Sequence, residues 1–66
     1  MDVDTKDNQG NTALHYAALW GHLEIVKRLV EERNMDVYTK DNQGNTALHY
    51  AALGGRLEIV KWLVEV

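Results

Sequence analysis

The chain has 66 residues, of which 45% are hydrophobic, and it contains neither cysteine nor proline. A chain of this length forms one small domain, and the lack of cysteine excludes disulfides, thiolate metal sites and cysteine nucleophiles. The formal net charge of −3 argues against binding to nucleic acid or to an anionic membrane, because both select basic surfaces. No apolar run reaches the roughly 18 residues of a membrane span and no signal peptide is recognised, so the compartment stays open, with the cytoplasm expected for a natural protein.

The polar segment at residues 5–11 predicts a tight turn before a helix. Gly10 can adopt the positive φ that such a turn requires, and Thr12 suits the N-cap of the helix that follows. The acidic residues Asp2, Asp4 and Asp7 lack the spacing of a calcium loop, so turn and cap chemistry is the better interpretation.

Two helices follow this turn. The first is expected over Ala13–Trp20, with Gly21 as its left-handed terminator. The second is expected over Leu23–Glu32, and its apolar stripe is broader than one partner helix needs. That stripe therefore predicts packing against both its own unit and a neighbouring unit. Asn34 is expected to end the helix in a left-handed conformation.

Residues 36–66 repeat residues 2–32 with a period of 34. Five of the 31 aligned positions differ: Asp4/Tyr38, Trp20/Gly54, His22/Arg56, Arg28/Trp62 and Glu32/Val66. The first repeat spans about residues 2–35 and the second about 36–66, with further helices expected over Ala47–Leu53 and Leu57–Glu65. Such a period indicates one supersecondary unit stacked on its copy.

The run Thr12-Ala13-Leu14-His15-Tyr16-Ala17 and its copy at 46–51 resemble the signature of the ankyrin repeat, as do the turn at 7–10 and the run at 21–26. The resemblance implies an all-α, ankyrin-repeat-like α-solenoid: two helix-turn-helix units joined by a β-hairpin-like loop, forming one domain over 1–66. It also implies a non-catalytic protein–protein interaction scaffold without a cofactor. In such a scaffold His15 and His49 are buried and bond the preceding threonine, whereas a zinc site would need further ligands.

The same resemblance implies a concave recognition face made of turn tips and outward helix residues. Three aromatic residues that break the repetition are added as possible interface anchors. The protein-binding residues expected are Asp7, Asn8, Gln9, Asn11, Leu19, Trp20, His22, Tyr38, Asp41, Asn42, Gln43, Asn45, Leu53, Arg56 and Trp62. The turn tips have the same sequence in both copies, so the alternative stays open that these residues are solvent-exposed and bind no partner.

Two units are fewer than such stacks normally need, which predicts uncapped apolar ends. The stripe of Leu23, Ile25, Val26 and Leu29 is expected to be bare at one end, and that of Leu57, Ile59, Val60 and Leu63 at the other. Burying about 400 Å² at each end would recover roughly 20 kcal/mol before association entropy. We therefore expect a homo-dimer or higher homo-oligomer, closed rather than open.

Near-identical copies also suggest a designed or minimal sequence, although recent duplication gives the same pattern. The alternative function is that of a fragment of a longer ankyrin array, which binds an external protein on its concave face.

Overall fold

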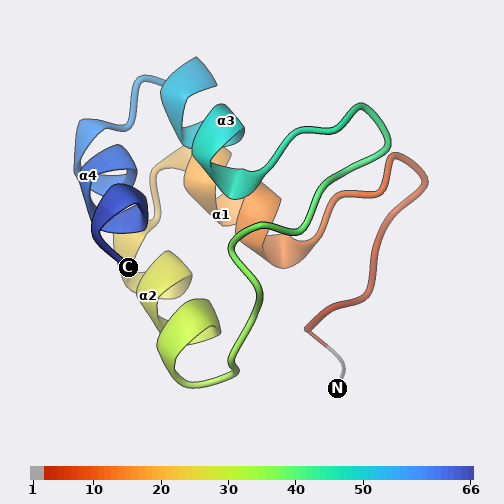
Figure 1. The fold of residues 1–66 in the computed structure, drawn as a ribbon, viewed down its shortest axis with the longest axis horizontal. Helices are drawn as coiled ribbons and strands as arrows, with labels where there is room; N and C mark the ends of the chain where they lie inside the picture. The colour runs from red at the N-terminus through yellow and green to blue at the C-terminus, as the bar shows by residue number, and fades with distance from the viewer. Residues whose placement is uncertain (1–2) are drawn as a thin grey trace.

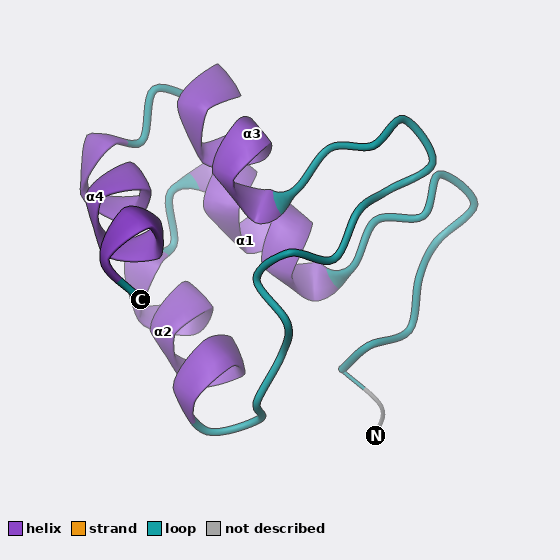
Figure 2. Ribbon diagram, viewed as in Figure 1, coloured by secondary structure: helices purple, strands orange, loops and turns teal. Residues whose placement is uncertain are grey.

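A computed structural model of the protein describes residues 3–66. The elements are α1 (Ala13–Trp20), α2 (Leu23–Glu31), α3 (Ala47–Leu53) and α4 (Leu57–Glu65), with no strand in that range (Figure 2). These bounds confirm the four helices expected from the sequence. The single difference is Glu32, which is the C-cap of α2 and lies outside it.

The four helices form two layers, and two long loops project from one of them. In Figure 1, α1 and α3 lie side by side, α2 and α4 form the second layer, and the loops extend away from that second layer. We call these loops the fingers: finger 1 covers residues 4–12 and finger 2 covers residues 36–46. The fingers have a hairpin shape without a strand ladder. Backbone hydrogen bonds close each tip, as from the N–H of Asp41 to the Asn45 carbonyl at 2.9 Å, and side chains add to them.

Each first helix begins with the same side-chain cap. In α1 the backbone N–H of Thr12 donates to His15 Nδ1 at 3.0 Å, and the Thr12 hydroxyl lies 3.0 Å from the same nitrogen. Thr12 is the N-cap in extended conformation, as predicted. The cap recurs in α3, where the N–H of Thr46 donates to His49 Nδ1 at 2.9 Å.

Left-handed residues end the elements where the sequence predicted them. Gly21 has φ 81° at the end of α1, and its N–H bonds back to the helix. Asn34 has φ 58° in the linker after α2. The chain then turns inward, because the N–H of Met35 donates to the Leu29 carbonyl at 3.1 Å and the Met35 side chain is buried.

One core lies between the two units. Its members are Leu14, Ala17, Ala18, Val26, Met35, Ala47, Ala51, Ile59 and Leu63. The four alanines of the core have small side chains, which allow α1 and α3 to approach closely.

The expectation that the apolar stripes of α2 and α4 are bare is partly wrong. Val26, Ile59 and Leu63 are all buried, with exposed fractions of 0%, 1% and 8%. Val26 belongs to the row of α2 that faces the second unit, whereas Ile59 and Leu63 belong to the row of α4 that faces the first. Each helix therefore leaves only its outward row exposed, as at Ile25 and Leu57.

The expected burial of both histidines holds only for His15. His15 is 2% exposed, its Nε2 lies 3.1 Å from the Thr39 carbonyl, and its ring meets Tyr50 edge-on. Because Nδ1 accepts the cap bond, Nε2 carries the ring proton and donates it to Thr39. His49 is exposed, since no third unit covers it among residues 3–66.

No helix within residues 3–66 combines the length and the apolar character needed to cross a bilayer.

The two histidines provide a matched pair of mutations. We expect His15→Ala to lower the free energy of unfolding by about 2 kcal/mol, because it removes a cap, a bond between units and a buried ring. His49→Ala should cost less than about 1 kcal/mol, because only the cap is lost. Urea denaturation followed by circular dichroism measures both, and equal losses would contradict the assignment.

Candidate protein-binding surface

The tip of each finger is held by one aspartate. In finger 2, Asp41 Oδ1 accepts the backbone N–H groups of Gln43 and Asn45 at 2.9 and 2.8 Å. In finger 1, Asp7 Oδ1 does the same for Gln9 and Asn11, both at 2.9 Å. The predicted turn chemistry is thus observed: each carboxylate holds the reversal of the chain that the glycine after it permits.

A tyrosine from the neighbouring helix holds the second carboxylate oxygen. The Tyr50 hydroxyl of α3 donates to Asp41 Oδ2, and the Tyr16 hydroxyl of α1 donates to Asp7 Oδ2. The bond from Tyr50, followed by the backbone N–H donors, lowers the pKa of Asp41 from 3.8 to about 2. The same bond raises the pKa of Tyr50 above 10.0. Each finger is therefore fastened to its own first helix.

The two fingertips are joined to each other. The backbone N–H of Asn42 donates to the Gln9 carbonyl at 3.0 Å, and Asn42 Nδ2 donates to the Asn8 carbonyl at 3.1 Å. This approach requires glycine at position 10, because a Cβ there would lie 2.6 Å from Asn42 Oδ1. The fingers consequently form one continuous surface.

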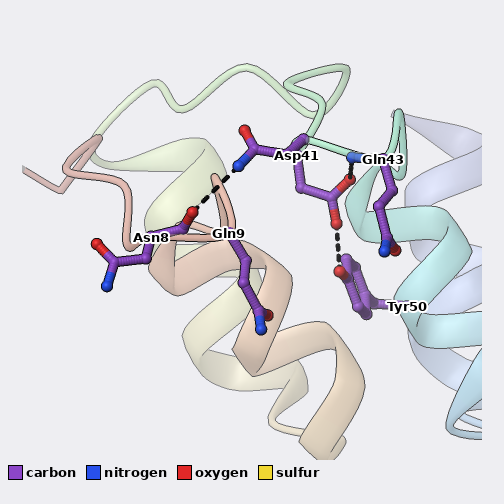
Figure 3. Close-up of a pocket in the computed structure, with 6 residues that line it drawn as sticks. Asn8, Gln9, Asp41, Gln43 and Tyr50 are labelled. Carbon is purple, nitrogen blue, oxygen red and sulfur yellow. Dashed lines mark hydrogen bonds between the residues drawn. The ribbon is translucent and has the colours of Figure 1, made fainter.

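A polar cavity of about 290 Å³ lies along this surface. We call it the finger cleft; it is lined by Asn8, Gln9, Asp41, Asn42, Gln43 and Tyr50. Figure 3 shows the Gln9 and Gln43 side chains extending in the same direction from neighbouring fingers, with Tyr50 beside Gln43. Both glutamines are exposed, and the Gln9 amide oxygen accepts one long bond of 3.4 Å from Asn11 Nδ2.

The chemistry of the finger cleft suits binding better than proton transfer. At neutral pH Asp41 is ionised and Tyr50 keeps its proton, and each stabilises that state in the other. A general acid or base needs a pKa near the working pH, and neither group has one. The amides of Asn8, Gln9 and Gln43 can both donate and accept hydrogen bonds, as the backbone of a peptide does.

The structure gathers only part of the expected site. Asn8, Gln9, Asp41, Asn42 and Gln43 line the finger cleft, with Asp7 at the tip beside them. Asn11 is 5% exposed, and its amide bonds Gln9 and the Tyr16 hydroxyl. Asn11 is buried and therefore supports the finger from within, whereas Asn45 is half-buried.

Leu19 and Arg56 belong to the contact between the units. Arg56 Nε donates to the Leu19 carbonyl at 3.0 Å, which caps the end of α1 from the second unit. These two atoms already bond each other, and a contact of either side chain with a partner stays a prediction.

Four other expected residues are exposed away from the finger cleft. His22 precedes α2 as its N-cap, and Tyr38 lies in finger 2 with 75% of its surface exposed. Trp20 ends α1 and Leu53 ends α3, with 61% and 76% exposed. They do not form one site with the fingertips.

Trp62 does not lie on an open end of the stack. It is half-buried, packs against the core and lines a hollow with Leu23 and Lys27 of the first unit. Trp62 therefore packs beside α2, and its expected role as an interface anchor stays a prediction.

Sequence reasoning did not anticipate the bonds from the tyrosines to the aspartates. The signal available was the constant spacing of nine residues between Asp7 and Tyr16 and between Asp41 and Tyr50. It also missed the exposure of Leu48 and Val64. The signal available was their place in the last unit, whose apolar end was expected to be uncapped.

The family model described as ankyrin repeats (3 copies) matches residues 1–66. The chain belongs to the ankyrin repeat family. Ankyrin repeats form protein–protein interaction scaffolds, which agrees with the expected kind of function.

Solved ankyrin-repeat structures have the same fold. A chain in the complex of the Bd0816 predatory endopeptidase from Bdellovibrio bacteriovorus with immunity protein Bd3460 is 32% identical, with a TM-score of 0.90 over 98% of this chain. A chain in the complex of the yeast ribosomal protein Rps3 with its chaperone Yar1 is 33% identical, with a TM-score of 0.91 over 96%. This chain covers 33% and 42% of those chains.

One curated relative matches a stretch about as long as one unit. The mitochondrial liver isoform of glutaminase from Mus musculus is 55% identical over 31 residues, which are 47% of this chain and 5% of that protein. An ankyrin segment can therefore be a small part of a much longer protein.

Among residues 3–66, no group of three or more His, Cys, Asp or Glu side chains is placed to hold a metal ion.

The low pKa of Asp41 gives a pH prediction. A carboxyl whose folded pKa is depressed stabilises the fold above its unfolded pKa and loses that contribution as the pH falls through the folded value. We expect stability to decline between pH 3.8 and about 2, and to decline less in Asp41→Asn. Thermal denaturation across this range measures it, with exposed Glu31→Gln as the charge-matched control. Equal slopes in Asp41→Asn and in the wild-type chain would contradict the bond to Tyr50.

Proposed function

We propose that this chain is a non-catalytic segment of an ankyrin array, which binds an external protein through the finger cleft and the adjoining surface of α1 and α3. The observation that supports this proposal is that two fingers, each fastened by its own aspartate and tyrosine, are joined into one surface with exposed amide side chains. Such a surface is pre-organised, so little conformational entropy is lost when a partner binds.

The chemistry of the finger cleft favours an extended peptide or a loop as the part that enters it. Gln9 and Gln43 offer paired donors and acceptors, whereas the carboxylate of Asp41 is already occupied by Tyr50 and two backbone N–H groups. Recognition by shape and amide bonds is therefore favoured over recognition by charge. The two solved relatives described above are both in complexes with other proteins, which supports the same kind of use here.

A displayed library of short peptides, selected against the immobilised chain, tests this function. We expect the enriched peptides to lose about tenfold or more in affinity for Asn8→Ala/Gln43→Ala, because tenfold corresponds to about 1.4 kcal/mol of lost hydrogen bonding. The matched control is Arg28→Ala/Glu31→Ala on the exposed face of α2. Peptides that respond to the control pair but not to the cleft pair would reject the finger cleft as the binding surface.

A second candidate function is self-association through the apolar end of the second unit. Leu53, Leu57 and Val64 are 76%, 64% and 67% exposed there, although large apolar side chains are usually covered. A closed symmetric dimer of two such ends would bury them without leading to a polymer.

Light scattering at micromolar concentration tests this second candidate. A dimer has twice the 7.5 kDa mass of one chain, and we expect Leu53→Lys to return it to a monomer because a charge would be buried. The control is Tyr38→Ser in finger 2, because Tyr38 is about as exposed as Leu53. This change should leave the mass unchanged. A wild-type chain that stays monomeric would remove self-association as a function.

A further inference from the structure

The surface around the finger cleft presents the same two kinds of side chain from each unit. Gln9 and Gln43 are equivalent residues and extend in the same direction from neighbouring fingers (Figure 3). Tyr16 of α1 and Tyr50 of α3 are also equivalent. A partner that lies along the stack therefore meets one amide and one aromatic ring in each unit.

Both tyrosine rings are held in place. The Tyr50 hydroxyl donates to Asp41, and the Tyr50 ring packs nearly perpendicular to the His15 ring, with the ring centres 5.4 Å apart. The Tyr16 hydroxyl donates to Asp7. Tyr50 lines the finger cleft, and Tyr16 is 40% exposed beside it. The rings thus offer fixed apolar surface next to the amides.

The distance between the units restricts the conformation of an extended partner. Packed helices lie about 8–10 Å apart, and equivalent residues of α1 and α3, which pack on each other, are separated by about that distance. One turn of a polyproline II helix takes about three residues and rises about 9 Å, so every third residue faces the same way at each unit. A β-strand covers about 10 Å in three residues, but the third residue then faces the opposite side. Of these two extended conformations, polyproline II matches the repeat of the units.

The hydrogen-bonding groups favour the same conformation. A polyproline II backbone makes no internal hydrogen bonds, so its carbonyl groups can accept from side-chain amides. Gln9 and Gln43 are exposed and carry such N–H donors. An α-helix uses its carbonyl groups internally except at its last turn, so it offers these amides few acceptors.

The lining residues favour an uncharged and stiff segment. Among residues 3–66, the finger cleft is lined by one charged side chain, that of Asp41, which is buried and bonded within its own unit. Proline is uncharged, packs well on aromatic rings, and has a φ fixed near the polyproline II value. A proline-rich segment therefore loses little conformational entropy on binding.

We propose that the segment that enters the finger cleft is a proline-rich polyproline II helix, with one turn for each ankyrin unit and a proline at every third residue against Tyr16 and Tyr50. The proposal rests on the function proposed above, because it names the kind of segment that the finger cleft binds. The two units of this chain hold two turns, which is about six residues.

Two synthetic peptides of equal length and composition test the conformation and its register. The first has proline at every third residue, and the second has the same prolines at every fourth residue. We expect the first peptide to bind about tenfold more tightly, because in the second peptide only one proline at a time can meet a tyrosine ring. Equal affinities would overturn the proposed register.

Nuclear magnetic resonance of the isotope-labelled chain measures this binding at the cleft itself. Gln9 and Gln43 are the two glutamines of the chain, so their side-chain amide signals report on the finger cleft. We expect the first peptide to shift both signals and to leave the indole signal of Trp62, which packs beside α2, unchanged. A shift of the Trp62 signal without a shift of the glutamine signals would reject the finger cleft as the site.

Peptide length provides a second test. The affinity should rise from one turn to two turns and then level off, because a third turn has no third unit to contact within residues 3–66. An affinity that keeps rising beyond two turns would contradict the assignment of one turn to each unit.

The contact with the aromatic ring is tested by a matched pair of variants. Tyr16→Phe and Tyr16→Ala both remove the hydroxyl that bonds Asp7, so the difference between them measures the ring alone. We expect Tyr16→Phe to bind the first peptide more tightly than Tyr16→Ala does, with circular dichroism to show that both variants are folded. Equal affinities of the two folded variants would show that the ring does not contact the peptide, and the proposal would be wrong.

The library selection described for the proposed function separates the two proposals. Selected peptides that respond to the cleft pair of mutations but are not enriched in proline would overturn the polyproline II proposal and leave the proposed function in place. If neither the selected peptides nor the proline peptides respond to that pair, the proposed function itself is wrong.

Discussion

The contact between α1 and α3 is the constraint on which the rest of the molecule depends. Ala17, Ala18, Ala47 and Ala51 are almost completely buried, and their small side chains allow the two helices to approach closely. This approach sets the spacing of the two fingers that precede the helices. Only at that spacing can Asn42 reach the carbonyls of Asn8 and Gln9. Larger residues in place of the alanines would separate the fingertips, and the finger cleft would open along with the core.

The fingers have no strand ladder, and hydrogen bonds to a carboxylate support the backbone bonds that close each tip. Each tip is a short loop in which one aspartate accepts two backbone N–H groups and one tyrosine hydroxyl. The Asp41 carboxylate is buried and its hydrogen bonds are made within the chain, so the finger cleft presents mainly amide groups to a partner. A surface of this kind distinguishes partners by the placement of donors and acceptors, since each unmatched polar group that a wrong partner buries costs free energy.

Two nearly identical units in one chain separate the effect of sequence from the effect of surroundings. His15 and His49 make the same cap bond, yet one is buried and the other is exposed. Local hydrogen bonds are therefore set by nearby residues, whereas burial is set by whichever unit lies next in the stack. The five differing positions carry the asymmetry, and Gly54, Arg56 and Trp62 all contribute to the contact between the units.

The sequence by itself determined the elements of this protein, because their causes are local. Thr12 caps a helix, Gly21 and Asn34 adopt left-handed conformations, and the period of 34 stacks one unit on its copy. The fingertip residues were also predictable by position. Only the tertiary structure decided which rows of α2 and α4 are buried, that Leu19 and Arg56 bond each other, and that Trp62 packs beside α2. These outcomes depend on how two units of nearly the same sequence are placed relative to each other. Burial of a side chain in one unit depends on the neighbouring unit, and the local sequence, which is nearly the same in both, does not specify it.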